Sequence, residues 1–187
     1  MQKTIPLLAV LALSALLSAC AVGPATEPAP APTAGTDTEA PIDLWQPVAE
    51  AFEQAAGPAG VEVAVEAAGL RLSIPAADGF ASGRDELQPA LVTSLHALVA
   101  PLGAHPELAA RIVGHTDSVG REGYNMLLSR QRARAVREFF MAAGIDPLRL
   151  SAEGRGEMDP VADNDTDAGR ARNRRVEIHL YRPDGGN

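Results

Sequence analysis

Along the last two thirds of the chain, short segments with a two-residue hydrophobic period alternate with longer segments of helical period. Val61, Val63 and Val65 alternate with polar or small residues, and the same pattern resumes after a turn at Gly69. A segment patterned for one type of secondary structure cannot present a single apolar face in the other. The alternation therefore predicts an α/β or α+β two-layer sandwich, with helices packed on a sheet. The strand candidates are 61–65, 70–74, 108–115, 149–156 and 175–181; the helix candidates are 88–102, 124–143 and a short turn at 166–173.

The start of the chain has the pattern of a bacterial export signal. One positive charge, Lys3, precedes an apolar run over residues 5–17, which is too short to span a bilayer comfortably. The run ends in the letters LSAC, which resemble the lipobox of bacterial lipoproteins. This resemblance implies removal of residues 1–19 as a signal peptide and acylation of Cys20 with fatty acids such as palmitate. Ala21, where an Asp would favour retention in the inner membrane, implies delivery to the outer membrane.

Residues 20–42 are interpreted as the lipidated cysteine and a tether rich in Ala, Pro and Thr. The tether has almost no large apolar residue, so it cannot bury enough surface to offset the entropy lost on ordering. In a polyproline conformation it would reach at most about 65 Å. A short amphipathic segment is predicted over 43–60, where apolar residues recur at near-helical spacing, and the main folded domain is predicted over 61–187.

The charge balance argues against a nucleic-acid partner. The chain has 24 acidic and 16 basic residues, and the excess acids lie mostly in residues 21–60, which carry six acids and no base. Such a segment is typical of a solvated tether. Cys20 is the only cysteine, so the fold has no internal disulfide.

Two charged residues are candidates for a site. Asp117 follows the strand candidate 108–115, and the ends of strands next to helix starts are where binding sites collect in such sheets. Arg132 interrupts the apolar stripe of the helix candidate 124–143, so it should be desolvated and should need a carboxylate or a ligand. Composition alone favours a structural salt bridge for Arg132, with Asp117 as the natural partner or co-ligand. Asp117 could also be an ordinary turn residue.

Three stretches carry a family resemblance. IVGHTDSVGREGYNMLLSRQRARAV, GRGEMDPVADND and GRARNRRVEIHL occur in this order between Phe80 and Leu180. Together they resemble the OmpA-like, peptidoglycan-associated (Pal-like) domain. The resemblance implies a βαβαβ-type sandwich that binds the peptide stem of peptidoglycan without a covalent bond. Ala81 stands where the family often has Asp, which puts contacts from that loop in question.

The resemblance also implies a set of binding residues. The residues that match Asp117 and Arg132 hold the free amine and the carboxylate of meso-diaminopimelate. This pairing suits a zwitterion, because a carboxylate accepts hydrogen bonds from an ammonium and a guanidinium donates two to a carboxylate. Further contacts are expected from Thr116, Ser118, Asn125 and Arg174.

These features predict an outer-membrane lipoprotein whose domain faces the periplasm and ties the membrane to the cell wall. The alternative is an accessory subunit of an envelope complex, Tol–Pal-like or part of a secretion apparatus, in which protein–protein contacts are primary. No cofactor is implied.

Two other readings are not supported by the sequence. The acids of 163–169 resemble the start of a calcium loop, but Ala168 stands where such a loop needs Gly and Arg174 where it needs Glu. The four histidines lack metal-site spacing. His115 has no nucleophile in its neighbourhood, so an enzyme is not expected, and a structural hydrogen bond is predicted for this histidine.

Overall fold

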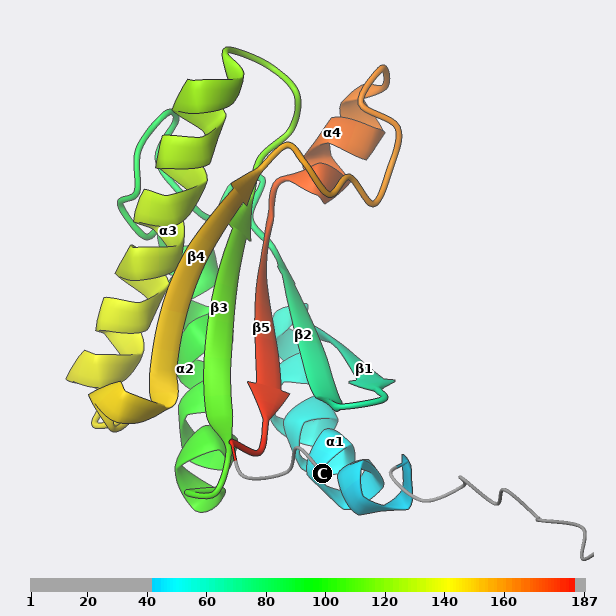
Figure 1. Cartoon of the computed structure of the whole chain (residues 1–187), viewed down its shortest axis with the longest axis vertical. Coiled ribbons are helices and arrows are strands. Elements are labelled where there is room, and N and C mark those ends of the chain that lie inside the picture. Colours follow the sequence, from blue (N-terminus) through cyan, green and yellow to red (C-terminus); the bar gives the residue numbers. More distant parts are fainter. Residues whose placement is uncertain (1–41, 184–187) are drawn as a thin grey trace, which may run out of the picture. The chain divides into compact units, whose positions relative to one another are not determined.

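The computed structural model describes residues 42–183. Cys20, the signal peptide and the tether up to residue 41 lie outside the described residues, so the predictions made for them remain predictions. Figure 1 shows the arrangement of the elements. In chain order they are α1 (Ile42–Ala56), the 3₁₀ turn η1 (Gly57–Ala59), β1 (Glu62–Glu66), β2 (Gly69–Pro75), α2 (Pro89–Ala104), β3 (Ala109–His115), α3 (Glu122–Ala142), η2 (Pro147–Arg149), β4 (Leu150–Gly156), α4 (Asp167–Asn173) and β5 (Arg175–Tyr181).

The five strands form one sheet in the order β1-β2-β5-β3-β4. The last strand, β5, inserts between β2 and β3 and is antiparallel to both, whereas β3 and β4 are parallel and joined by the long helix α3. The β3–α3–β4 unit is the crossover connection that parallel strands require. It brings the carboxyl ends of β3 and β4 to the same end of the sheet as the start of β5. The predicted two-layer α/β arrangement is confirmed.

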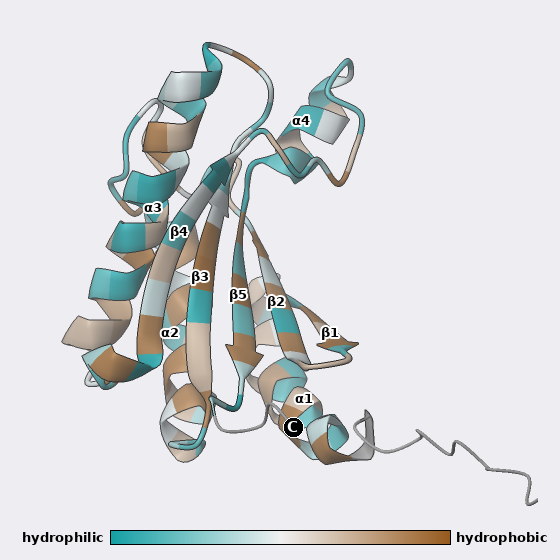
Figure 2. Ribbon diagram, in the orientation of Figure 1, coloured by the Kyte–Doolittle hydropathy of each residue, from teal (hydrophilic) through white to brown (hydrophobic). Residues whose placement is uncertain are grey.

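Alternation along the strands divides the sheet into an apolar and a polar face, and Figure 2 shows brown and teal residues alternating along β2 and β5. The apolar face packs against α1, α2 and α3. Helix α1 contributes to this core through Trp45, Val48 and Phe52, which are all buried. Segment 43–60 is therefore packed on the sheet domain. Among the described residues, no helix combines the length and the apolarity needed to cross a bilayer.

Helix α3 lies directly on the sheet because two glycines leave room for it. A Cβ atom on Gly114 of β3 would overlap the backbone carbonyl oxygen of Ser129, and one on Gly154 of β4 would overlap the backbone nitrogen of Arg130. Their lack of a side chain sets the separation between helix and sheet. Because α3 carries Arg132, these glycines also position the candidate site.

Candidate functional site

A cavity of about 560 Å³ opens at the carboxyl end of β3, between the first turns of α3, the loop after β2, and α4. It is the place where the sheet edge, the loop and two helices meet (Figure 1). The structure brings five of the six predicted binding residues to its wall: Thr116, Asp117, Asn125, Arg132 and Arg174. Its remaining lining residues are Ala77, Asp78, Phe80, Ser82, Gly83, Val119, Tyr124, Leu128 and Arg170.

The Asp117 side chain, two residues after the end of β3, accepts two hydrogen bonds. Its Oδ1 accepts from the backbone N–H of Val119 at 3.1 Å, which is the turn geometry typical of an Asp that ends a strand. Its Oδ2 accepts from Arg174 Nη1 at 2.7 Å, and the Asp117 side chain is 13% exposed. The turn role and the ion-pair role therefore occur together, on different oxygens. The ion-pair partner is Arg174 and not Arg132.

Arg132 is buried without an acidic partner. Its residue exposure is 8%, its Nε donates to the backbone oxygen of Arg84 at 3.0 Å, and its guanidinium lies 4.8 Å from the centre of the Phe80 ring. Across residues 42–183 it forms no ion pair, and its two terminal nitrogens donate no hydrogen bond. Burial lowers the pKa of the Arg132 guanidinium, which means that the charged form is poorly solvated. The structural salt bridge that composition favoured is thus wrong.

Thr116 and Asn125 both line the cavity and serve different purposes. Thr116 is buried, its N–H donates to the carbonyl of Gly156 at 2.9 Å, and its hydroxyl oxygen has no partner within the described residues. The Nδ2 of Asn125 lies 2.6 Å from the Glu157 carboxylate and within 3.3 Å of two backbone oxygens of the loop that follows β3. Asn125 therefore braces that loop, whereas the hydroxyl of Thr116 is buried without a partner in the described residues.

Ser118 is the predicted site residue that the structure does not bring to the cavity. It is exposed, and its N–H donates to the side-chain oxygen of Asn164 at 3.2 Å. The strand ends at His115, so the direction of the Ser118 side chain is set by the turn that follows and not by strand alternation. Ser118 instead fastens the loop to the segment before α4.

Phe80, Tyr124 and Arg170 are wall residues that sequence reasoning did not assign. The Tyr124 hydroxyl donates to the carbonyl of Gly83 at 3.2 Å, which holds the loop after β2 over Arg132. Arg170 donates to the carbonyl of Asn164 at 2.7 Å and pairs with an exposed acid of its own helix. Tyr124 and Arg170 lie within the stretches that carry the resemblance, and Phe80 lies at the start of the region it covers, so motif position was the one available signal.

The inner part of the cavity carries an excess of positive charge. Asp117, Arg132 and Arg174 contribute two positive charges and one negative charge, and Asp78 and Arg170 add one charge of each sign to the wall. A guanidinium with free terminal nitrogens beside a well-placed carboxylate can hold a ligand that carries both charges. Within residues 42–183, no cluster of three or more His, Cys, Asp or Glu side chains is arranged to hold a metal ion.

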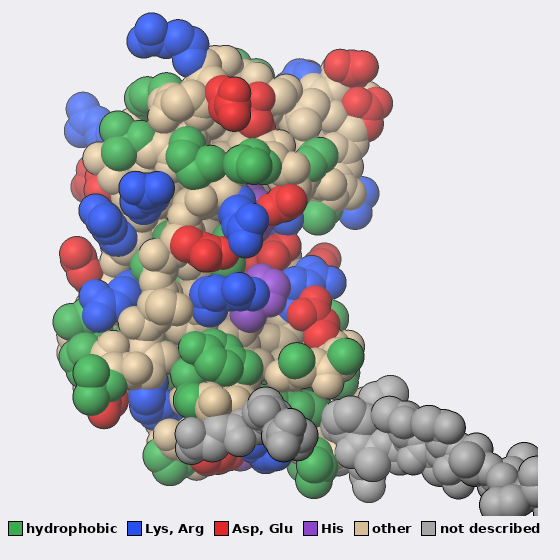
Figure 3. Space-filling view, in the orientation of Figure 1, with side chains coloured by type: hydrophobic (Ala, Val, Ile, Leu, Met, Phe, Trp, Pro, Cys, Tyr) green, Lys and Arg blue, Asp and Glu red, His purple; other side chains and the backbone are tan. Residues whose placement is uncertain are grey.

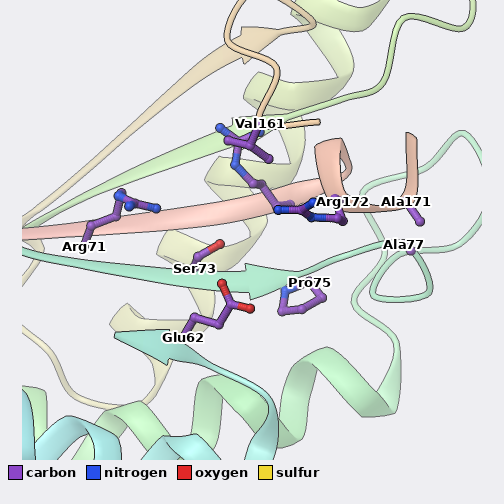
Figure 4. A pocket seen from close by; sticks show the side chains of 9 residues that line it. Glu62, Arg71, Ser73, Pro75, Ala77, Val161, Ala171 and Arg172 are labelled. Carbon is purple, nitrogen blue, oxygen red and sulfur yellow. The ribbon is translucent and has the colours of Figure 1, made fainter. Parts of the chain in front are cut away.

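A second hollow, of about 460 Å³, lies under α4 on the open face of the sheet, and Figure 4 shows the side chains that line it. Glu62, Arg71 and Arg172 border it. In the space-filling view of this face, acidic and basic side chains are intermixed (Figure 3). The buried guanidinium at this hollow, that of Arg175, is paired with Glu177 at 2.7 Å, which distinguishes the hollow from the cavity at β3.

The open face also holds a buried carboxylate, that of Glu177. Its oxygens lie 2.7 Å from Arg175 Nε, 3.1 Å from His179 Nε2 and 3.6 Å from His115 Nε2. Burial alone would raise the pKa of Glu177, but these basic neighbours outweigh it and hold its pKa well below the usual range. His115 is 4% exposed, and neither ring nitrogen forms a hydrogen bond within the described part of the chain. Its Nε2 nevertheless lies 3.6 Å from the Glu177 carboxylate and helps to lower the pKa of Glu177, so the structural hydrogen bond predicted for His115 corresponds to this slightly longer contact.

Glu177→Gln is expected to lower the free energy of unfolding by about 2 kcal/mol near neutral pH, because buried Arg175 loses its charged partner. The folded-state pKa of Glu177 lies below the unfolded value of about 4.3, so its carboxylate stabilises the fold above that value. This contribution is lost as the pH falls toward the folded-state pKa. The two proteins should therefore converge in stability below about pH 4 when urea unfolding is measured across a pH series.

The control for this prediction is Glu153→Gln. Glu153 lies on the same face and pairs at 3.2 Å with Arg155, but both side chains are exposed. A surface pair of this kind contributes about 0.5 kcal/mol, so the control should be nearly neutral. A stability difference between wild type and Glu177→Gln that stays constant down to strongly acidic pH would contradict the assignment.

Comparison with known proteins identifies the domain that carries the cavity. The model of the OmpA family matches residues 79–174, just over half of the chain. The chain belongs to the OmpA family. The matched range includes the loop after β2, the end of β3, α3 and α4, which are the segments that line the cavity. The family resemblance expected from the sequence is confirmed.

Two curated relatives match about two thirds of this OmpA-family protein. The probable lipoprotein YiaD of Escherichia coli is 37% identical over 121 residues, which cover 65% of this chain and 55% of YiaD. The peptidoglycan-binding protein ArfA of Mycobacterium tuberculosis is 38% identical over 125 residues, covering 65% of this chain and 38% of ArfA. The chain thus spans about half, or less, of the length of these relatives.

Solved structures show the same fold. The cell wall anchor of the type VI secretion system from Pseudomonas aeruginosa superimposes with a TM-score of 0.63 at 29% identity, over 72% of this chain and 96% of that one. The peptidoglycan-associated lipoprotein from Burkholderia pseudomallei has a TM-score of 0.52 at 29% identity, over 58% and 88% of the two chains. The α/β sandwich is therefore the family's fold.

Proposed function

We propose that this OmpA-family protein is an outer-membrane lipoprotein that binds the diaminopimelate-containing peptide stem of peptidoglycan and ties the membrane to the cell wall. The observation that carries the proposal is Arg132, a buried guanidinium whose terminal nitrogens have no protein partner in the described residues and which lines the same cavity as Asp117. A buried charge without a counterion is costly in the free protein. A carboxylate ligand relieves that cost.

The free end of diaminopimelate has the matching chemistry. It carries an ammonium and a carboxylate on one carbon atom. Asp117 accepts hydrogen bonds from the ammonium, and Arg132 donates two to the carboxylate, in the planar fork that guanidinium and carboxylate form. The unpartnered hydroxyl of Thr116 is a further donor or acceptor in the same wall. Tyr124 holds the loop after β2 through Gly83, and the Phe80 ring lies against the Arg132 guanidinium.

The names of the relatives support a cell-wall ligand. ArfA is a peptidoglycan-binding protein, and the two structural neighbours are a cell wall anchor and a peptidoglycan-associated lipoprotein. The secretion-system anchor also supports the second candidate, a role as a subunit of an envelope complex. In that role the same cavity would hold the complex to the wall.

The position of α1 fits a tethered protein. Arg182, just after β5, stacks on the Trp45 ring of α1 at 5.1 Å, so α1 lies at the end of the sheet where β5 finishes. The cavity is at the other end, where β5 begins (Figure 1). The described chain therefore enters the folded domain, at the start of α1, on the end opposite the cavity.

Binding without catalysis is the role proposed for the cavity. Its lining has no His or Cys among the described residues, and His115 belongs to the open face of the sheet. A nucleophile with a neighbouring general base, the arrangement that hydrolysis of the stem would need, is not formed by these side chains.

Ligand variants test the proposal directly. The protein is expected to bind a diaminopimelate stem peptide, and to bind the same peptide with lysine about tenfold to a hundredfold more weakly, because lysine lacks the carboxylate for Arg132. N-acetylation of the free amine should weaken binding similarly, since it removes the positive charge that pairs with the Asp117 carboxylate. Calorimetric titration measures all three affinities. Equal affinity for the three peptides would refute the proposed site.

A further inference from the structure

The Asp117 carboxylate is already engaged in the free protein, and this constrains the ligand. One oxygen accepts the N–H of Val119, and the other accepts Arg174 Nη1 at 2.7 Å. A ligand ammonium that reaches Asp117 must either displace Arg174 or lie beside it. Displacement leaves a guanidinium without a counterion, and coexistence places two positive charges next to each other. A ligand that brings a second negative group gives Arg174 a partner and makes both outcomes more favourable.

We propose that Arg174 is a specificity-determining residue that binds a second carboxylate of the ligand. The cavity then selects a peptide end with one ammonium and two carboxylates. The proposal rests on the proposed function, whose ammonium and first carboxylate are assigned to Asp117 and Arg132. The charge balance leads to the same ligand. The three inner residues carry a net charge of one positive unit, and a ligand with two carboxylates and one ammonium carries one negative unit.

The local structure lets the Arg174 side chain change partners while its backbone stays in place. Its N–H donates to the carbonyl of Arg170 at 3.0 Å at the end of α4, and its own carbonyl accepts the N–H of Ala76 at 2.9 Å. The Arg174 side chain is 32% exposed, and within the described residues its ion pair is with Asp117. A change of rotamer can therefore carry the guanidinium from Asp117 to a ligand carboxylate, without disturbing the start of β5.

Neighbouring arginines do not share these properties. Arg170 lines the cavity, but its guanidinium is held by the Asn164 carbonyl and by Asp167. Arg172 is exposed and borders the other hollow, the one shown in Figure 4. Arg172 therefore provides a control that removes the same charge from the same helix without altering the cavity.

Two stem peptides test the inference in the full protein. Both keep the ammonium and carboxylate of the free diaminopimelate centre; in the second peptide every other carboxylate is an amide. The unchanged protein is expected to bind the amidated peptide about tenfold to a hundredfold more weakly, the effect of losing a charge-assisted hydrogen bond. Arg174→Gln should bind both peptides with equal affinity, and Arg172→Gln should discriminate as the unchanged protein does.

The outcomes separate this inference from the proposed function. If the unamidated peptide does not bind the unchanged protein, the proposed function fails. If it binds but amidation has no effect, or if the amidation penalty persists in Arg174→Gln, the second-carboxylate role of Arg174 is overturned. Thermal unfolding of each variant checks that it is folded. Arg174→Met, which keeps the apolar stem of the side chain, carries the same expectation should the Gln variant be unstable.

Discussion

Arg132→Gln is expected to bind the diaminopimelate stem peptide about a hundredfold more weakly than the unchanged protein, because the ligand carboxylate loses its bidentate partner in a desolvated site. Its affinity for the lysine-containing peptide should hardly change, since that ligand has no carboxylate at this position. The variant therefore loses discrimination as well as affinity. Calorimetric titration with both peptides measures the two effects in one experiment.

The same substitution should leave the free protein as stable as before, or more stable. In the free protein the guanidinium is buried with a carbonyl and an aromatic ring but no carboxylate, so its desolvation is poorly compensated. The lost hydrogen bond to Arg84 should cost no more than about 1 kcal/mol. A residue that is needed for binding and costs stability is a signature of a functional group, whereas a structural arginine would show the opposite pattern.

Arg134→Gln is the matched control for Arg132. Arg134 lies two residues along the same helix and is exposed. Its removal changes the net charge by the same amount but should leave both the affinity and the discrimination between the peptides unchanged. If Arg132→Gln binds the diaminopimelate peptide as tightly as this control, the assignment of Arg132 is wrong.

Gly114→Ala is expected to lower the free energy of unfolding by about 3 kcal/mol, the upper range for overpacking in a core. The added methyl group would overlap the backbone carbonyl of Ser129, which cannot move without shifting the whole of α3. A shift of α3 displaces Arg132 relative to Asp117. Peptide affinity should therefore fall together with stability, although Gly114 does not touch the cavity.

Gly103→Ala is the control for this prediction. Gly103 lies in α2, and a Cβ atom there meets nothing within 4 Å. Because alanine favours a helix over glycine, this variant should be more stable by about 0.5 to 1 kcal/mol. Urea unfolding of the two variants gives both values. Equal stability of Gly114→Ala and the unchanged protein would show that α3 does not depend on close contact with β3.

The order of the elements was accessible from the sequence because each element is encoded by local periodicity. The alternating apolar residues of 70–74 and 175–181 predict β2 and β5, and the helical stripe of 124–143 predicts α3 to within two residues of its observed ends. The insertion of β5 between β2 and β3 is not encoded in this way. It depends on which strands pair across the sheet, and β2, β3 and β5 have similar apolar faces.

The partners of the charged residues were predicted less well. Arg132 was recognised as a desolvated cation, since a charge within an apolar stripe is a local signal, but its proposed salt bridge is absent. Asp117 pairs instead with Arg174, which lies 57 positions away in the sequence. His115 was expected to form a structural hydrogen bond, but the sequence did not indicate its partner, the Glu177 carboxylate at 3.6 Å. Side-chain pairing at this sequence separation depends on the sheet order, which local patterns do not contain.

The sequence by itself determined the layered α/β architecture, the family, and the presence of a buried arginine and a strand-end acid in the motif region. Only the tertiary structure decided that Arg174 forms an ion pair with Asp117 and that Ser118 does not line the cavity. It also decided that the neighbours of Arg132 are an aromatic ring and a backbone carbonyl. The physical reason is that hydrophobic periodicity is a property of adjacent residues. The electrostatic environment of a site is instead set by elements distant in the chain, and β5 brings one of them to the end of β3.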